Sequence, residues 1–82
     1  MTNNFILEIT QDLAQRVRQH RKRSGLTQQQ LAQFAGIGKT AVFDIEHAKP
    51  SVQWDTLLKV LQILNIQVKF ISVLPDAQEA GS

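Results

Sequence analysis

Two short helical segments, separated by a three-residue turn that begins with a glycine, do most to limit how this chain can fold. The first segment begins at Thr27, where Gln30 three positions later completes a capping box, and Gly36 ends it. The second segment is predicted from about Lys39 to His47, with its apolar residues on one side. The sequence therefore predicts two short helices joined by a tight turn.

Longer helices are predicted on either side of this pair. Upstream, a helix is expected to begin at Thr10 and to end at Ser24-Gly25. Downstream, a helix is expected from about Val52 to about Leu64, with Ser51 as its cap. The apolar stripe of this last helix consists of Trp54, Leu57, Leu58, Leu61 and Leu64.

The character of the chain changes after the last helix. Ile66, Val68 and Phe70 alternate with polar residues, and β-branched and aromatic residues are frequent. This pattern predicts a β-strand. The chain is thereby divided into an N-terminal arm (1–9), a helical domain (10–65), a strand (66–74) and a disordered tail (75–82).

A single strand needs a partner, because it leaves a row of unpaired backbone N–H and C=O groups. The partner is either residues 5–9 or the same strand of a second chain. The segment 66–74 is the longer and more apolar of the two, which favours pairing with its own copy in a C₂ homodimer. The side chains expected in that interface are Ile66, Val68, Phe70, Ile71 and Val73.

Composition excludes several classes of function. The 82 residues include no Cys, so disulfides, thiol nucleophiles and Cys-rich zinc sites are excluded, and two histidines are too few for a multi-histidine metal site. No nucleophile–base pair or phosphate-binding loop is recognisable, so we expect neither enzyme activity nor a cofactor. The apolar runs are far shorter than a membrane span and no signal peptide is recognisable. A cytoplasmic, nucleoid-associated protein without membrane contact is expected.

The positive charge is concentrated in one place. The net charge is only +2, but five of the nine Lys and Arg residues lie close together in the sequence. They are Arg16, Arg18, Arg21, Lys22 and Arg23. Such a run is either a solvated helix face or a patch that faces phosphate groups, because clustered Lys and Arg supply sequence-independent affinity for DNA. Charge alone does not decide between the two interpretations.

Two short helices joined by a tight glycine turn have the geometry of a helix-turn-helix, whose second helix enters the major groove of DNA. The chain resembles the Xre family of lambda-repressor-like domains over about residues 13–64. The matching stretches are Val17-Arg18-x-x-Arg21-Lys22, Gly25-Leu26-Thr27-Gln28-x-x-Leu31-Ala32, Ala35-Gly36-Ile37, Val42-x-x-Ile45-Glu46 and Thr56-Leu57-Leu58-Lys59-Val60-Leu61. The resemblance implies a mainly α fold, a four- to five-helix lambda-repressor-like domain, to which the C-terminal β-strand adds pairing across a dimer.

Several of the matched residues have structural roles. Arg21 and Glu46 resemble the family's ion pair between the first and third helices. A partly buried pair would fix how these helices sit, whereas an exposed pair would contribute little. Gly36 permits the sharp turn. The residues expected to close the core between the helices are Leu31, Ala32, Ile37, Val42 and Ile45.

The resemblance places the residues that read DNA on the helix that begins at Lys39. Lys39 can reach guanine O6 and N7, Thr40 can contact either type of base, and Asp44 can accept from cytosine N4. Gln28, at the start of the preceding helix, matches the family's contact to a phosphate or an edge base. The full set expected to contact DNA is Gln28, Gln29, Lys39, Thr40, Ala41, Phe43, Asp44, Arg18 and Lys22.

Four further residues stand out against the family's pattern. Phe43 occupies a usually polar position, and it either touches thymine methyl groups or packs against a neighbour or partner. His20 is interpreted as a partly buried structural histidine rather than a pH sensor. Gly38 replaces the usual capping Ser or Thr, which costs only about a few tenths of a kcal/mol. Trp54 is interpreted as a core residue rather than a ligand platform.

The end of the chain narrows the resemblance further. The last helix leads directly into a strand, as in the HipB-type antitoxins, whose C-terminal strand pairs across a dimer. That resemblance implies two roles: repression of the protein's own operon at an inverted-repeat operator in double-stranded DNA, and neutralisation of a HipA-type Ser/Thr kinase toxin. The alternative is a stand-alone Xre-type phage or restriction-control repressor without a toxin partner.

Overall fold

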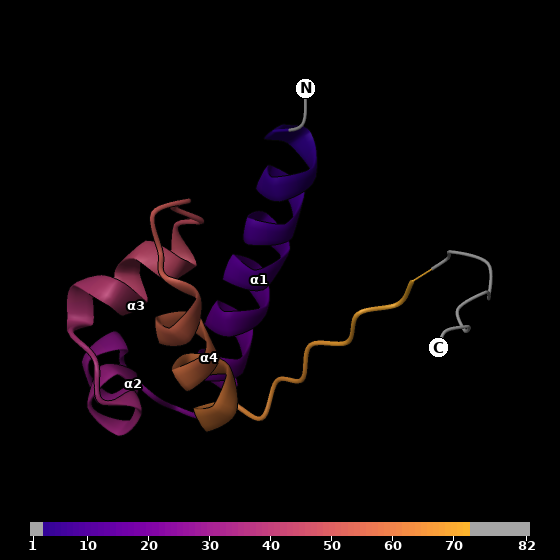
Figure 1. Ribbon diagram of the computed structural model, residues 1–82. Coiled ribbons are helices and arrows are strands. Elements are labelled where there is room, and N and C mark those ends of the chain that lie inside the picture. The colour runs from indigo at the N-terminus through magenta and orange to yellow at the C-terminus, as the bar shows by residue number, and fades with distance from the viewer. Residues whose placement is uncertain (1–2, 73–82) are drawn as a thin grey trace.

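The computed structural model describes residues 3–72, and their side chains from Ile9 onward. Four helices follow one another in this part of the chain: α1 (Asn3–Arg23), α2 (Gln28–Ala35), α3 (Lys39–Glu46) and α4 (Trp54–Ile63). Helices α2, α3 and α4 gather beside the C-terminal part of α1, whose first turns extend beyond them (Figure 1). Within residues 3–72, no helix combines the length and the apolar character needed to cross a membrane.

The core contains one completely buried side chain from each helix. These are Val17 in α1, Leu31 in α2, Val42 in α3 and Val60 in α4. Every residue that the sequence predicted for the core between the helices either belongs to this buried cluster or packs against it. Burial of a side chain of this size stabilises the fold by about 1.5–3 kcal/mol. The cluster therefore holds α2 and α3 in a fixed relation to α1 and α4.

All four helices end in the same backbone arrangement, at a residue with a left-handed conformation. Those residues are Gly25, Gly36, Ala48 and Asn65, with φ between 55° and 73°. In each case the next N–H donates to the carbonyl five positions back, which satisfies a carbonyl group at the helix end. The four hydrogen bonds are Leu26 to Arg21 (3.1 Å), Ile37 to Ala32 (3.0 Å), Lys49 to Asp44 (3.0 Å) and Ile66 to Leu61 (2.9 Å).

The starts of α2 and α3 agree with those predicted from the sequence, but the start of α4 does not. Thr27 and Gln30 form the predicted capping box, and Gly38 caps α3 without a side-chain hydrogen bond. Helix α4 is capped by Gln53 rather than by the predicted Ser51. Ser51 lies in a turn that the hydrogen bond from the N–H of Val52 to the Lys49 carbonyl closes, so the helix begins only after this turn.

The N-terminal segment is helical where the sequence predicted an arm. Helix α1 begins at Asn3 rather than at Thr10, so residues 3–9 are its first turns. Nothing between Asn3 and Arg23 is a glycine or a proline, and the helix that packs against the core therefore continues toward the N-terminus. This arrangement removes residues 5–9 as a partner for a strand in the same chain.

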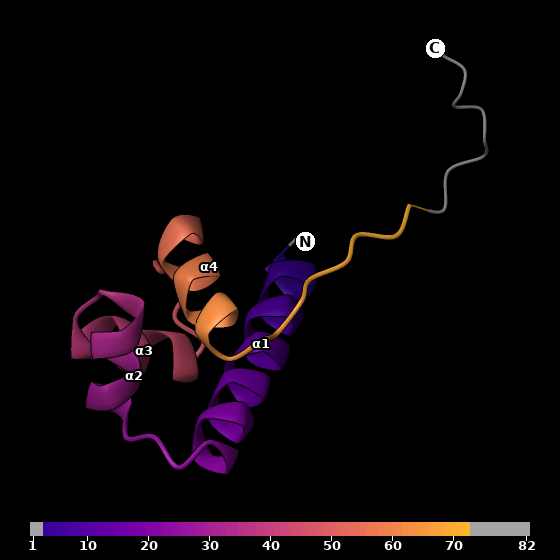
Figure 2. The same cartoon turned by 90° about the horizontal axis from the view of Figure 1, so that it is seen from below.

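The segment after α4 leaves the helices as an extended chain (Figures 1 and 2). Ile66 packs against the core, but Phe70 and Ile71 are 84% and 83% exposed. The segment forms no β-strand within residues 3–72, because a strand requires a ladder partner and these residues supply none. The predicted Val73 and the predicted tail of residues 75–82 lie outside the described residues.

Candidate nucleic-acid interface

Helix α3 has one buried and one exposed side. Val42 and Ile45 point into the core, while Lys39, Thr40 and Phe43 are exposed. Because an α-helix turns once in 3.6 residues, positions 39, 40, 43, 44 and 47 share one face. We call these five residues the α3 face. Asp44 belongs to it and is half-buried, whereas Ala41, also predicted to touch DNA, is half-buried outside it.

The start of α2 contributes two glutamines with different surroundings. Gln29 is exposed. Gln28 is half-buried, and its side-chain amide donates to the Glu46 Oε1 atom at 3.1 Å. Gln28, which was predicted to contact a phosphate group, therefore hydrogen-bonds the Glu46 carboxylate that also pairs with Arg21 of α1. Sequence reasoning missed this contact, because the two residues are far apart in the chain.

Arg21 and Glu46 form a bidentate ion pair between α1 and α3. Arg21 Nε donates to Glu46 Oε2 at 2.6 Å, and Nη2 donates to Oε1 at 3.0 Å. Arg21 Nη1 also donates to the Leu26 carbonyl at 2.8 Å. The two charged side chains are only 10% and 2% exposed. This pair fixes the angle between α1 and α3, and thereby the direction in which the α3 face points.

The pKa values of both partners reflect this contact. The hydrogen bond to Glu46 raises the pKa of Arg21 further above its already high value, although burial opposes the shift. For Glu46, burial is the largest single influence and raises the pKa, whereas hydrogen bonds from Arg21 and Gln28 lower it. The positive charges of Arg21 and Arg18 act in the same direction, so the pKa of Glu46 lies below its usual value.

The basic run on α1 does not form one uniform patch. Arg21 is buried in the ion pair, and Arg16 contacts Asp12 at 3.0 Å. Arg18 and Lys22 are exposed and lie one helical turn apart on the same side of α1. Arg18 is also close enough to α3 for its charge to lower the pKa of Glu46. Arg18 and Lys22 are therefore the cations of this run best placed to contact phosphate groups beside the α3 face.

An aromatic cluster lies at the C-terminal part of the α3 face. The Phe43 and His47 rings are stacked, with centroids 3.8 Å apart and an interplanar angle of 20°. The Lys49 amino group lies 5.9 Å from the centroid of the Phe43 ring and 3.6 Å from the Asp44 carboxylate. Sequence reasoning did not assign His47 or Lys49 to the site. The i, i+4 spacing of Phe43 and His47 was the available signal, because such side chains are neighbours on a helix.

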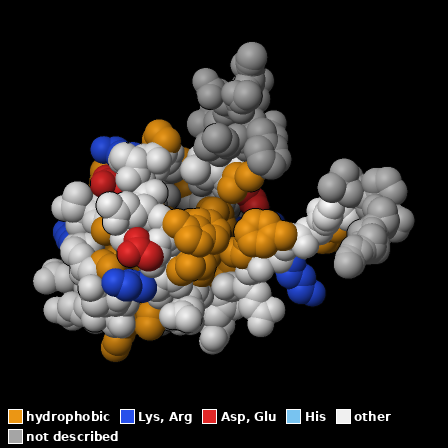
Figure 3. Space-filling view, viewed as in Figure 1, with side chains coloured by type: hydrophobic (Ala, Val, Ile, Leu, Met, Phe, Trp, Pro, Cys, Tyr) orange, Lys and Arg blue, Asp and Glu red, His pale blue; other side chains and the backbone are white. Residues whose placement is uncertain are grey.

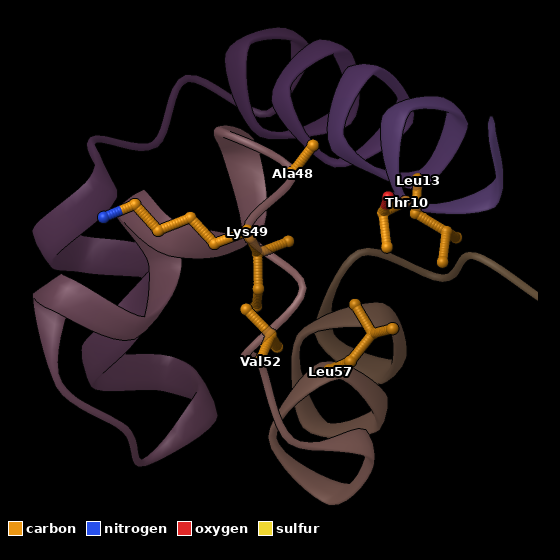
Figure 4. A pocket seen from close by; sticks show the side chains of 7 residues that line it. Thr10, Leu13, Ala48, Lys49, Val52 and Leu57 are labelled. Atoms are coloured by element: carbon orange, nitrogen blue, oxygen red, sulfur yellow. The ribbon is translucent and has the colours of Figure 1, made fainter. Parts of the chain in front are cut away.

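Two shallow hollows lie between the N-terminal half of α1 and the start of α4. The smaller, of about 30 Å³, is lined by residues that include Leu13, Val52 and Leu57. Lys49 lines it with its aliphatic stem while its amino group points away (Figure 4). The larger, of about 210 Å³, is lined in part by Trp54, which is 53% exposed. Both fall below the roughly 300 Å³ of an ordinary small-molecule pocket.

Trp54 is therefore not the core residue that the apolar stripe of α4 predicted. The stripe continues through Leu61 and Leu64, which are buried, but Trp54 lies at the first turn of α4, at the edge of the larger hollow, and remains half exposed. His20 is half-buried, as predicted. Within residues 3–72, no group of three or more His, Asp or Glu side chains is arranged to hold a metal ion.

Comparison with known proteins shows the family to which this chain belongs. A family model described as a helix-turn-helix domain matches residues 12–68. The HTH-type transcriptional regulator y4mF of Sinorhizobium fredii is 36% identical to this chain over 61 residues, which cover 74% of this chain and 80% of that protein. Control protein C.SmaI of Serratia marcescens is 32% identical over 62 residues, which cover 76% of this chain and 74% of that protein. The chain belongs to the helix-turn-helix domain family.

Proposed function

We propose that this protein is a sequence-specific DNA-binding transcriptional repressor with no catalytic activity. The observation that carries the proposal is the α3 face. Lys39, Thr40 and Phe43 are exposed there, on a helix whose opposite side is buried in the core. An α-helix fits the major groove of B-DNA, and the second helix of a helix-turn-helix lies there. The similarity to the HTH-type transcriptional regulator y4mF and to control protein C.SmaI also supports this role.

The α3 face offers different chemistry at each position. Lys39 can donate to guanine O6 and N7, and Thr40 can donate or accept. Asp44 can accept from cytosine N4, but its contact with Lys49 at 3.6 Å must then be shared or broken. Arg18, Lys22 and Gln29 are exposed on the flanking helices and would contact phosphate groups, which set the register without reading sequence.

The test of this assignment is the ratio of affinities for two duplexes. One duplex contains the region upstream of the protein's own gene, and the other has a random sequence. Lys39→Ala should lower the affinity for the first by about 1–3 kcal/mol and thereby reduce the ratio. Lys59→Ala, which removes the same charge from α4, should leave the ratio unchanged. An unchanged ratio for Lys39→Ala would show that α3 is not the helix that contacts the bases.

We further propose that the repressor is a homodimer that binds an inverted repeat. The extended segment after α4 exposes Phe70 and Ile71 almost completely. A hydrophobic patch is also visible beside α4, on the side of α1 and the extended segment (Figure 3). On α4, Trp54 and Leu58 are 53% and 38% exposed. Surfaces of this kind favour association, and a second copy of the segment offers the ladder partner that a strand requires. Half-sites about 34 Å apart would match such a dimer.

The leading proposal for its biological role is the antitoxin of a type II toxin–antitoxin system. Helix α4 leads directly into the extended segment, with no further helix within residues 3–72. This order of elements is that of the HipB-type antitoxins which the sequence resembles. The partner would be a HipA-type Ser/Thr kinase toxin, held through surfaces away from the α3 face, while the same dimer represses the operon.

A stand-alone regulator is the second candidate, and one observation favours it. The two relatives, control protein C.SmaI and the transcriptional regulator y4mF, are similar to this chain over about three quarters of its length, and neither is named as an antitoxin. Such a repressor would use the segment after α4 solely for dimerisation and would have no toxin partner.

Affinity purification from the native organism at high salt separates the two candidates. High salt removes proteins that are bridged only by DNA, because phosphate contacts weaken steeply as ions are added. A kinase-sized protein in stoichiometric amount, identified by mass spectrometry, would support the antitoxin role. Recovery of the homodimer alone would support the stand-alone regulator.

A further inference from the structure

Phe43 occupies an unusual place for a large apolar side chain. It lies in the middle of the α3 face, one turn from Lys39 and one turn from His47, and it is 41% exposed. It is not among the apolar side chains that pack against the buried core. Its partners are instead polar residues at the surface, so core packing does not explain it.

Local contacts hold the Phe43 ring at this surface. His47 stacks on it, and the His47 Nδ1 atom lies 2.8 Å from the Phe43 carbonyl oxygen, which fixes the histidine ring beside the helix end. The Lys49 amino group lies 5.9 Å from the ring centroid and contacts Asp44. The ring is therefore supported from the C-terminal side of α3 and presented outward with its position already set.

We propose that Phe43 reads the 5-methyl group of a pyrimidine in the major groove. A phenyl ring can neither donate nor accept a conventional hydrogen bond from a base edge. The apolar group that ordinary DNA displays in the major groove is the thymine C5-methyl group, and 5-methylcytosine displays the same group. The inference rests on the proposed function, because it requires α3 to lie in the groove.

Exchange of thymine for uracil tests this inference, since it removes the methyl group and leaves every hydrogen-bonding atom in place. In the duplex from the upstream region, each thymine is replaced in turn. Burial of one methyl group corresponds to about a fourfold change in affinity. We expect the unmodified protein to lose about this factor at one thymine in each half-site. Replacing cytosines in turn by 5-methylcytosine shows whether that base is the preferred source of the methyl group.

Two variants assign the effect to Phe43. Phe43→Ala should bind the thymine duplex more weakly and should not distinguish thymine from uracil. Phe34→Ala is the matched control, because Phe34 is an exposed phenylalanine (64%) on α2, outside the α3 face. It should keep the full thymine–uracil difference. The exchange on the unmodified protein needs no variant, so a folding defect in Phe43→Ala cannot obscure the result.

The outcomes separate this inference from the proposed function. Suppose that Lys39→Ala reduces the affinity ratio but that no methyl exchange at thymine or cytosine changes the affinity. The proposed contact of Phe43 with a methyl group is then wrong, while the assignment of α3 as the helix that contacts the bases is retained. A thymine–uracil difference that survives in Phe43→Ala also overturns the inference. A protein that binds no duplex in preference to random sequence overturns both.

Discussion

Two arginines on α1 each contact a carboxylate, but in different surroundings. Arg16 and Asp12 are 58% and 59% exposed and lie one turn apart on the same helix. Arg21 and Glu46 are 10% and 2% exposed and join two helices. Water screens the first pair, so it contributes little, whereas the second pair is held in a fixed bidentate geometry. The orientation of the α3 face depends on this second pair.

The first prediction compares the two arginines directly. Arg21→Lys keeps the charge but loses the planar fork that holds both carboxylate oxygens and the Leu26 carbonyl. We expect the free energy of unfolding to fall by about 2 kcal/mol, measured by chemical denaturation. Arg16→Lys is the control and should change it by less than about 0.5 kcal/mol. Equal losses in the two variants would refute the structural role of the buried pair.

The second prediction concerns acid stability. The pKa of Glu46 is lowered in the folded state, so its ionisation stabilises the fold above the pKa of the unfolded chain. This contribution is lost as the pH falls below about 4.3 and passes through the folded-state pKa. Glu46→Gln should therefore be less stable near neutrality, and its stability should decline less steeply in acid.

Denaturation curves at several pH values check the acid prediction. Asp12→Asn, which removes one exposed carboxylate, is the control for the change in net charge. If Glu46→Gln loses stability in acid as steeply as the unmodified protein, the ionised carboxylate does not stabilise the fold as described.

Residue patterns predicted contacts within the core but not exposure at its edges. The spacing of Leu31, Val42 and Ile45 indicated one buried side for each short helix, and the structure places them there. The same reasoning failed at Trp54, because periodicity identifies a helix side but not whether another element covers it. The tie between Gln28 and Glu46 also depends on how α2 and α3 pack, which no local pattern contains.

The four helix ends share one backbone geometry but not one residue type. Gly36 and Ala48 both adopt φ values in the left-handed region, at 73° and 55°. Glycine accepts this conformation without strain, whereas a side chain makes it costly by about 1–2 kcal/mol. Nothing lies within 4 Å of a Cβ atom built on Gly36, so backbone strain is what a side chain there would add.

The third prediction concerns two separate variants, one at each of these positions. Gly36→Ala should lower the free energy of unfolding by about 1 kcal/mol, and Ala48→Gly should raise it by a similar or smaller amount. Thermal and chemical denaturation measure both. Opposite signs are the expected result, and a loss of stability in Ala48→Gly would contradict the assignment of strain to that residue.

Helix boundaries were predictable where the local chemistry is strong. The capping box at Thr27 and the glycine at position 36 mark the limits of α2, because their hydrogen bonds are local. The start of α1 and the start of α4 were misplaced. A threonine or serine is able to cap a helix but need not do so, and the chain continued the helix through Thr10 and turned at Ser51.

Within residues 3–72, the extended segment after α4 forms no β-ladder with another part of the chain. The one other stretch considered as a strand, residues 5–9, is part of α1. Phe70 and Ile71 are the two most exposed of the large apolar side chains within the described residues. These facts support the proposed pairing between two copies, which a single chain cannot display.

The fourth prediction tests that pairing. Phe70→Ser should shift the protein from dimer to monomer at micromolar concentration, measured by analytical ultracentrifugation, and should weaken operator binding. Gln67→Ser, in the same segment, is the control and should remain dimeric. Shortening the chain after Ile66 should act like Phe70→Ser while keeping the hydrogen bond from the Ile66 N–H to Leu61 that closes α4. A shortened chain that still sediments as a dimer would place the interface elsewhere.

Selection from a random duplex library tests whether α3 reads a DNA sequence. The purified protein is bound to the library at moderate salt through successive rounds, and the retained duplexes are sequenced. We expect one enriched inverted repeat, with half-sites about 34 Å apart, and a changed base preference when the selection is repeated with Lys39→Ala. Retention of duplexes with no common sequence, or the same repeat for Lys39→Ala without any loss of preference, would contradict this expectation.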